Sequence, residues 1–170
     1  MTDSAQEDAL LELLNTTPVV DGAPVDRLAD AAAGRAWLRE RDGRGSEAER
    51  RAVREVRDLL QQVVRGQRTP RALAPALDGV SWRPSVRDQG LDWLLDAPAE
   101  RRYGARMVLT WFQLHGTRPG RLRPCANDEC LLFLLDRSKA NTARWCSMAA
   151  CGNRMKARRH HQRTRSATAG

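Results

Sequence analysis

The chain has 170 residues, of which 41% are hydrophobic and 29% charged, as in an average soluble globular protein. Lysine and arginine together number 29 against 21 acidic residues, which gives a net charge of +8 at pH 7. No apolar run approaches the length of a membrane span, and the acidic N-terminal residues are unlike a secretory signal, so we expect a cytoplasmic protein.

The first two-thirds of the chain predict a mostly helical body. A capping box over residues 46–49 opens the clearest helix, in which Val53, Val56 and Leu60 recur at helical spacing. The leucines of residues 4–14 favour a helix, although so short an apolar run also fits a strand. The expected helices cover residues 4–14, 25–40, 47–65 and 70–77, followed by a last one that Asp96 caps and Gly116 ends.

Two segments of the body predict turns and strands. Residues 19–24 have the composition of a turn, and residues 80–85 and 91–95 predict a β-hairpin. The sequence contains no internal repeat and no glycine-rich motif that could cradle a phosphate. The predicted fold class is therefore mainly α with short β-hairpins.

The charge divides the chain into two parts. Residues 1–117 carry a net charge of −1, whereas residues 118–170 carry +9 together with all four cysteines. Glycine and proline in residues 116–121 favour a junction there. We expect a helical domain over residues 1–117, a basic cysteine-bearing module over residues 118–165 and a disordered tail over residues 166–170.

The four cysteines form two matched pairs, each with four intervening residues, and fifteen residues separate the pairs. Such a pattern predicts one tetrahedral Zn²⁺ held in a small treble-clef or ribbon-like finger. Disulfides are disfavoured because cytosolic thiols stay reduced, and the spacing differs from that of redox dithiols. Four thiolates leave zinc no open position for water, so we expect a structural ion and no enzyme. The predicted ligands are Cys125, Cys130, Cys146 and Cys151.

A basic segment follows the second cysteine pair. Residues 147–163 predict a helix, with Met148, Cys151 and Met155 on the side that packs on the zinc module. No acidic residue follows Asp136, so salt bridges within the segment are excluded, and the cations are free to meet phosphates. A solvated charged face or a solubilising tail is the alternative. The predicted nucleic-acid contacts are Arg144, Arg154, Lys156, Arg158, Arg159 and Arg163.

Several motifs of this region resemble those of the CGNR zinc-finger family, whose finger follows a so-called ABATE domain. The matching runs are Cys125-Ala-Asn-x-x-Cys130, Asp136-Arg-Ser138, Arg144-Trp-Cys-Ser-Met148 and Cys151-Gly-Asn-Arg154. The body matches more loosely, as in Leu13-Leu-Asn-Thr16 and Trp37-Leu38. The resemblance implies a bacterial, stress-linked transcription regulator that binds zinc through the four cysteines and binds DNA.

The sequence departs from the family pattern in two places. Residues 138–141 read Ser-Lys-Ala-Asn where family members more often carry Ser-Arg-Asn, and Ala143 stands where a second arginine is common. Both departures are expected to affect a nucleic-acid contact without touching the metal.

Three side chains of the finger have specific expected roles. Asn153 is expected to donate to a cysteine sulfur or to cap a turn, and Trp145 to pack in the core because it adjoins a ligand. Arg154 either clamps the finger through backbone carbonyls or meets phosphate, and the sequence favours neither role.

Double-stranded DNA is the partner that the sequence favours, with zinc as the only expected cofactor. The alternatives are an RNA-binding module, against which the scarcity of aromatic residues near the finger argues, and a zinc-stabilised protein-interaction module. The N-terminal domain is a candidate for forming a homodimer or for binding a small-molecule effector. The DNA target, the oligomeric state and the sensed signal are left open.

Overall fold

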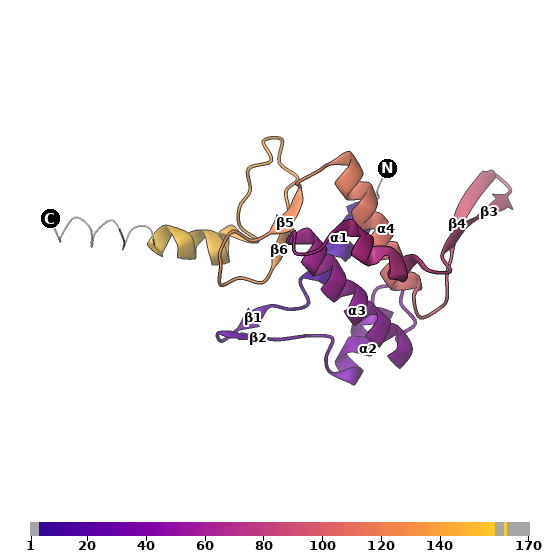
Figure 1. Ribbon diagram of the computed structural model, residues 1–170, viewed down its shortest axis with the longest axis horizontal. Helices are drawn as coiled ribbons and strands as arrows, with labels where there is room; N and C mark the ends of the chain where they lie inside the picture. The colour runs from indigo at the N-terminus through magenta and orange to yellow at the C-terminus, as the bar shows by residue number, and fades with distance from the viewer. Residues whose placement is uncertain (1–3, 159–161, 163–170) are drawn as a thin grey trace.

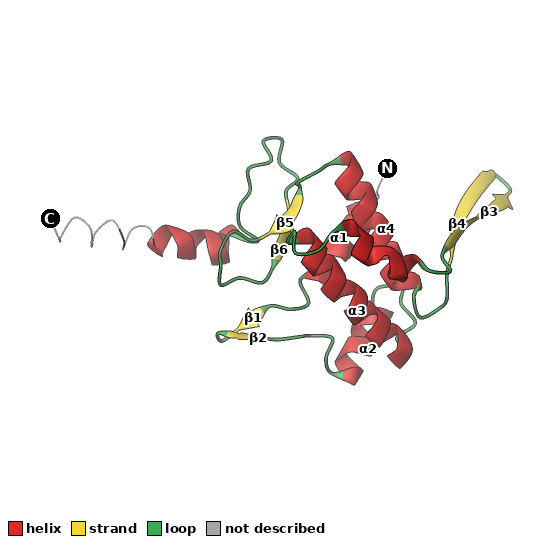
Figure 2. Cartoon of the chain, in the orientation of Figure 1, coloured by secondary structure: helices red, strands yellow, loops and turns green. Residues whose placement is uncertain are grey.

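The computed structural model describes residues 4–158 and residue 162. Its helices form a body from which small β-hairpins extend (Figures 1 and 2). The helices are α1 (Ser4–Leu14), α2 (Ala31–Arg39), α3 (Glu47–Val64) and α4 (Arg102–Thr117), with a 3-10 helix η1 (Pro70–Leu77). Residues 153–158 form the described part of a further helix, the basic helix of the finger. The fold class predicted from the sequence, mainly α with short β-hairpins, is confirmed.

Three antiparallel strand pairs complete the described part of the chain. Each pair is a separate two-stranded sheet. The pairs are β1 (Val19–Val20) with β2 (Ala23–Pro24), β3 (Ser81–Arg87) with β4 (Gly90–Asp96), and β5 (Leu122–Pro124) with β6 (Phe133–Leu135). The predicted turn at residues 19–24 thus closes a short hairpin, in which Asp21 and Gly22 take positive φ angles of 50° and 81°.

The core of the body forms around α3, which packs against α1, α2 and α4. Its apolar stripe is buried because Val53 and Leu60 recur on one face, as their spacing predicts. Ser46 caps this helix, since its side chain accepts a hydrogen bond from the Glu49 amide at 3.1 Å. The predicted Ser46 cap therefore begins the helix at the expected residue, while the Glu49 carboxylate accepts a hydrogen bond from the Gly45 amide at 2.7 Å in place of the Ser46 amide.

Two helices begin later than predicted. Residues 25–30 form a loop because the Asp26 carboxylate accepts a hydrogen bond from the Leu28 amide at 2.9 Å, and Asp30 then caps α2. The predicted cap at Asp96 is wrong, since that residue pairs with Ser81 at the end of β4. The last body helix begins at Arg102 instead.

The strands β5 and β6 attach the cysteine-bearing segment to the body. Phe133 of β6 is 1% exposed and belongs to the same hydrophobic core as the leucines of α1. The Asn15 side chain makes two hydrogen bonds with the backbone of Phe133. Its Oδ1 accepts from the Phe133 amide at 2.7 Å, and its Nδ2 donates to the Phe133 carbonyl at 3.2 Å. The body and the base of the finger therefore share one core.

Candidate metal centre and nucleic-acid interface

The four cysteines converge on one point. Their sulfur atoms all lie within 4.8 Å of one another, and Cys146 Sγ is 3.7 Å from both Cys130 Sγ and Cys151 Sγ. Zn–S bonds of about 2.3 Å in a tetrahedron require sulfurs about 3.8 Å apart. The donor set and its spacing therefore fit one structural Zn²⁺, and the predicted ligand set Cys125, Cys130, Cys146 and Cys151 comes together.

Backbone hydrogen bonds position the two cysteine pairs. The first pair follows β5, where the Cys125 amide donates to the Leu132 carbonyl at 2.9 Å. The Ala126 amide donates to the Arg144 carbonyl at 2.8 Å, which brings in the chain of the second pair. That pair then closes over a π-helical turn, η2 (Met148–Gly152), capped by Ser147. The two turns therefore face each other across the metal position.

Asn127 supports the site from the first turn. Its side chain is fully buried, and its Nδ2 donates to Cys151 Sγ at 3.5 Å. The sequence suggested this role for Asn153, which is exposed at the end of η2. The signal for Asn127 was its place two residues after a ligand, within the motif that carried the family resemblance.

The thiol pKa values reflect these surroundings. Burial raises the pKa of Cys130 to about 11, and burial also raises that of Cys146. At Cys151 burial acts in the same direction, but the hydrogen bond from Asn127 and those from the other thiols outweigh it and lower the pKa. Since zinc binds thiolates, metal binding must displace the protons that the buried thiols hold.

Asp136 organises the loop between the two cysteine pairs. Its carboxylate accepts hydrogen bonds from the Ser138 amide at 2.9 Å, the Ala143 amide at 2.8 Å and Arg123 Nη2 at 2.8 Å. The hydrogen bond with Ser138, the bond from the Ala143 amide and the charge of Arg123 lower the Asp136 pKa to about 2. The Ala143 residue takes part through its backbone amide. The alanine that stands here in place of the family's arginine therefore keeps the hydrogen bond to Asp136 that holds the loop.

Gly152 lies in a tight part of the η2 turn, where a larger residue would push the flexible end of the Met148 side chain aside. A Cβ there would lie 2.8 Å from the Met148 side chain and 3.3 Å from the Trp145 ring. Trp145 is half-buried against this turn, and the Arg144 guanidinium lies 5.3 Å from its ring centroid. Met148 itself is 53% exposed, so the predicted packing of this side chain into the zinc module is only partial.

The predicted nucleic-acid residues differ in their surroundings. Arg144, Arg154 and Lys156 are exposed, and none of them makes an ion pair with another described residue. Arg158 pairs with Glu129 of the first cysteine turn. The remaining predicted contacts, Arg159 and Arg163, lie outside the described residues, as does the predicted tail over residues 166–170.

The ion pair of Arg158 corrects the expectation that salt bridges are excluded from the basic segment. No acidic residue follows Asp136 in the sequence, but Glu129, which precedes it and lies 29 residues before Arg158, pairs with this arginine. Hydrogen bonding and the charge of Arg158 lower the Glu129 pKa. The same carboxylate is also close enough to feel the charge of Arg154.

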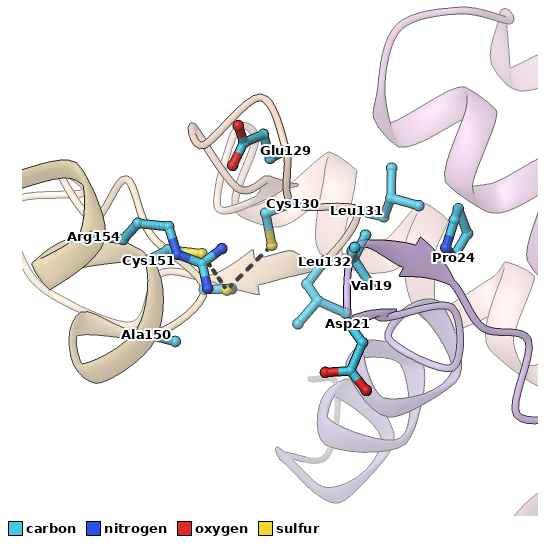
Figure 3. A pocket seen from close by; sticks show the side chains of 12 residues that line it. Val19, Asp21, Pro24, Glu129, Cys130, Leu131, Leu132, Ala150, Cys151 and Arg154 are labelled. Atoms are coloured by element: carbon cyan, nitrogen blue, oxygen red, sulfur yellow. Dashed lines mark hydrogen bonds between the residues drawn. The ribbon is translucent and has the colours of Figure 1, made fainter. Parts of the chain in front are cut away.

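A cleft of about 830 Å³ separates the β1–β2 hairpin from the metal site (Figure 3). Val19 and Asp21 line one side, and Cys130 and Cys151 line the other. Arg154 lies at the rim of this cleft and makes no hydrogen bond with any described residue. Its expected clamp through backbone carbonyls is therefore not formed within the described part of the chain.

Known families match both parts of the chain. Residues 121–164 match the model of the CGNR zinc finger, and residues 7–132 match the ABATE model, described as "putative stress-induced transcription regulator". No curated protein matches significantly, and no described helix is long and apolar enough to cross a membrane. Since the second match covers well over half of the sequence and the first contains all four converging cysteines, the chain belongs to the ABATE family and ends in a zinc-binding CGNR finger.

Proposed function

We propose that this protein is a cytoplasmic transcription regulator whose zinc finger binds double-stranded DNA. The observation that carries the proposal is the concentration of positive charge on the finger, with a net charge of +9 over residues 118–170 against −1 over residues 1–117. In the body, buried or half-buried arginines such as Arg50, Arg54 and Arg57 are committed to carboxylates. On the finger, Arg154 and Lys156 are exposed without an acidic partner among the described residues, which leaves them available to phosphates.

The surroundings of the two aromatic residues near the finger favour a duplex over a single strand. Single strands are bound largely by stacking bases on exposed rings. Phe133 is buried beneath the Arg65 guanidinium, and Trp145 is half-buried with Arg144 against its ring. Neither ring presents the open face that base stacking needs, whereas cations suit a phosphate backbone.

In this proposal zinc acts as a scaffold. Four thiolates fill a tetrahedral coordination sphere, so the ion holds the two cysteine turns and the start of the basic helix in place. The reducing cytoplasm keeps the thiols available for the metal. We assign the protein no catalytic activity.

Salt dependence tests the proposal directly. Binding of the zinc-loaded protein to a labelled 20-base-pair duplex is expected to weaken steeply with salt, with a log–log slope of about −4.5 for about five neutralised phosphates. A double variant, Arg154→Ala with Lys156→Ala, is expected to lose about tenfold in affinity at 0.1 M salt and to reduce the slope by about 2. Fluorescence anisotropy between 50 and 200 mM salt, as approximate limits, measures both quantities.

The matched control is Arg68→Ala with Arg71→Ala, which removes the same charge from exposed positions of the body. If both double variants lose affinity equally, the finger has no special role. A slope near zero for the unaltered protein would contradict phosphate binding altogether. Tighter binding to a single-stranded RNA of equal length would favour the RNA-binding alternative.

Glu129 competes with phosphate for the finger's cations. Because its carboxylate pairs with Arg158 and lies near Arg154, Glu129→Gln is expected to raise affinity for the duplex about threefold at low salt. The control Glu55→Gln removes the same charge from an exposed position on α3 and is expected to leave affinity unchanged. Unchanged or weaker binding of Glu129→Gln in the same titration would place Arg158 outside the DNA interface.

A further inference from the structure

The β3–β4 hairpin extends away from the helical body, on the side opposite the C-terminal basic helix (Figure 1). Its seven residue pairs run from Ser81 opposite Asp96 to Arg87 opposite Gly90. Cross-strand partners share a face, and alternate residues of a strand share a face too. The register therefore sorts the side chains of the hairpin into two sets.

One face of the hairpin is entirely apolar. It carries Trp82, Pro84, Val86, Leu91, Trp93 and Leu95. Four of these side chains are largely open to solvent: Trp82 is 54% exposed, Val86 85%, Leu91 54% and Trp93 59%. The hairpin therefore presents two tryptophans and two aliphatic residues on one continuous surface.

This surface is large for a hairpin of its size. Since an aromatic side chain buries about 150–250 Å² when it is covered, the four side chains offer roughly 500 Å². The largest apolar patch on a soluble monomer is typically about 300–600 Å² and often functional, so this hairpin alone presents a patch of that rank. A two-stranded hairpin alone is only marginally stable in water, so a partner on the apolar face would stabilise it.

The opposite face indicates what kind of partner fits. It carries Arg83 and Arg87 beside Asp92 and Asp96, and Arg87 Nε pairs with Asp92 Oδ2 at 2.7 Å. Charges of both signs give the hairpin no preference for a polyanion or an acidic membrane surface. A second hairpin of the same kind, by contrast, offers an apolar face of equal size, and the charged faces of both copies stay in water when the two apolar faces pack together.

The geometry favours contact through the face rather than through the strand edge. On the β3 edge, Pro84 has no amide proton to offer, and a proline in a strand blunts that edge against the addition of another strand. Two apolar faces packed together bury roughly 1,000 Å², the area at which a specific dimer interface becomes sustainable. A twofold axis makes such a contact with itself, using the same residues from both copies.

We propose that the β3–β4 hairpin is a dimerisation arm, whose apolar face packs on the same face of a second copy of this chain. The contact leaves the finger of each copy free, because the hairpin and the basic helix lie on opposite sides of the body (Figure 1). The proposal does not depend on DNA binding, and its test uses no nucleic acid.

Sedimentation equilibrium of the full-length, zinc-loaded protein measures the dimer directly. The expected mass at high protein concentration is twice the 19.1 kDa of one chain. The double variant Trp82→Ser with Trp93→Ser is expected to sediment as a monomer at every concentration. The control Phe112→Ser removes a 40% exposed aromatic side chain from α4 and is expected to remain a dimer.

A second measurement guards against a hairpin that fails to form in the variant. In the unaltered protein, dilution through the dissociation range is expected to shift tryptophan emission to longer wavelength, because Trp82 and Trp93 become exposed to water. The hairpin variant is expected to show no such shift. A monomer at all concentrations up to millimolar, or a dimer that survives the double substitution, overturns the proposal.

Discussion

Removal of the zinc by a chelator is expected to unfold residues 144–158 while helices α1 to α4 and strands β5 and β6 keep their structure. Structural zinc contributes about 10–16 kcal/mol to the folding of finger peptides, so its loss removes the main stabilising interaction of the second cysteine turn. Most of that turn, residues 147–150, is exposed and has little apolar surface to hold it in place.

The base of the finger is held differently. Phe133 is buried in the core of the body, and Asn15 bonds its backbone. Arg65 Nη2 also donates to the Leu131 carbonyl at 2.7 Å, and its guanidinium lies 4.3 Å from the Phe133 ring centroid. Because none of these contacts involves the metal, β6 is expected to stay in place when zinc leaves.

Hydrogen-exchange mass spectrometry with and without chelator measures this division. Amides of residues 144–158 are expected to lose protection, those of α3 serve as the internal control, and added zinc is expected to restore the original pattern. A chromogenic chelator is expected to report one zinc per chain. Unchanged protection of residues 144–158 would mean that the metal does not stabilise the finger.

Local sequence patterns predicted the elements that depend on local chemistry. The apolar spacing of α3, the Ser46 cap and the two cysteine pairs each involve residues close together in the chain, and each is found where expected. The family resemblance is confirmed over both parts of the chain. In each of these cases the residues that form the recognisable sequence pattern are also the residues that pack, cap the helix or converge on the metal position.

Interactions between distant segments account for what the sequence did not predict. Asn15 and Phe133 are 118 residues apart, and Glu129 and Arg158 are 29 apart. No periodicity or spacing links such pairs. The late start of α2 has a similar origin. Asp26 forms ion pairs with Arg54 and Arg57 of α3, and the residues around it form a loop instead of the first turns of the helix. The predicted domain boundary between residues 117 and 118 stays a prediction. The segment that follows it contributes Phe133 to the core of the body, so the two parts share buried contacts.

Replacement of Arg57 by alanine is expected to lower the free energy of unfolding of the body by about 3 kcal/mol. Breaking a buried ion pair by removing one partner leaves an uncompensated charge and costs about 3–5 kcal/mol. Arg57 is 2% exposed, and its guanidinium donates hydrogen bonds to both carboxylate oxygens of Asp26, at 2.5 and 3.0 Å. It also donates to Thr16 Oγ1 at 3.2 Å. The lower end of the range applies because Asp26 keeps some contact with water and still pairs with Arg54.

Arg54 provides the matched control on the same helix and the same carboxylate. Its Nη2 lies 2.8 Å from Asp26 Oδ2, but its side chain is 35% exposed. Exposed ion pairs contribute at most about 1 kcal/mol, so Arg54→Ala is expected to cost less than a third as much as Arg57→Ala. Urea denaturation followed by circular dichroism measures both variants. Equal losses would show that burial does not decide the strength of these pairs.

The pH dependence of stability provides a second test of the Arg57–Asp26 pair. Burial opposes ionisation of Asp26, but hydrogen bonds from Arg57 and from the Leu28 amide lower its pKa from 3.8 to about 2. Because the folded-state pKa lies below the unfolded-state value, the stabilisation is complete above pH 3.8 and is lost as the pH falls through 2. Acid titration of the unaltered protein is expected to show this loss. In Arg57→Ala the Asp26 pKa moves toward its ordinary value, although the Leu28 amide and Arg54 still lower it, so its share of the acid sensitivity is expected to shrink.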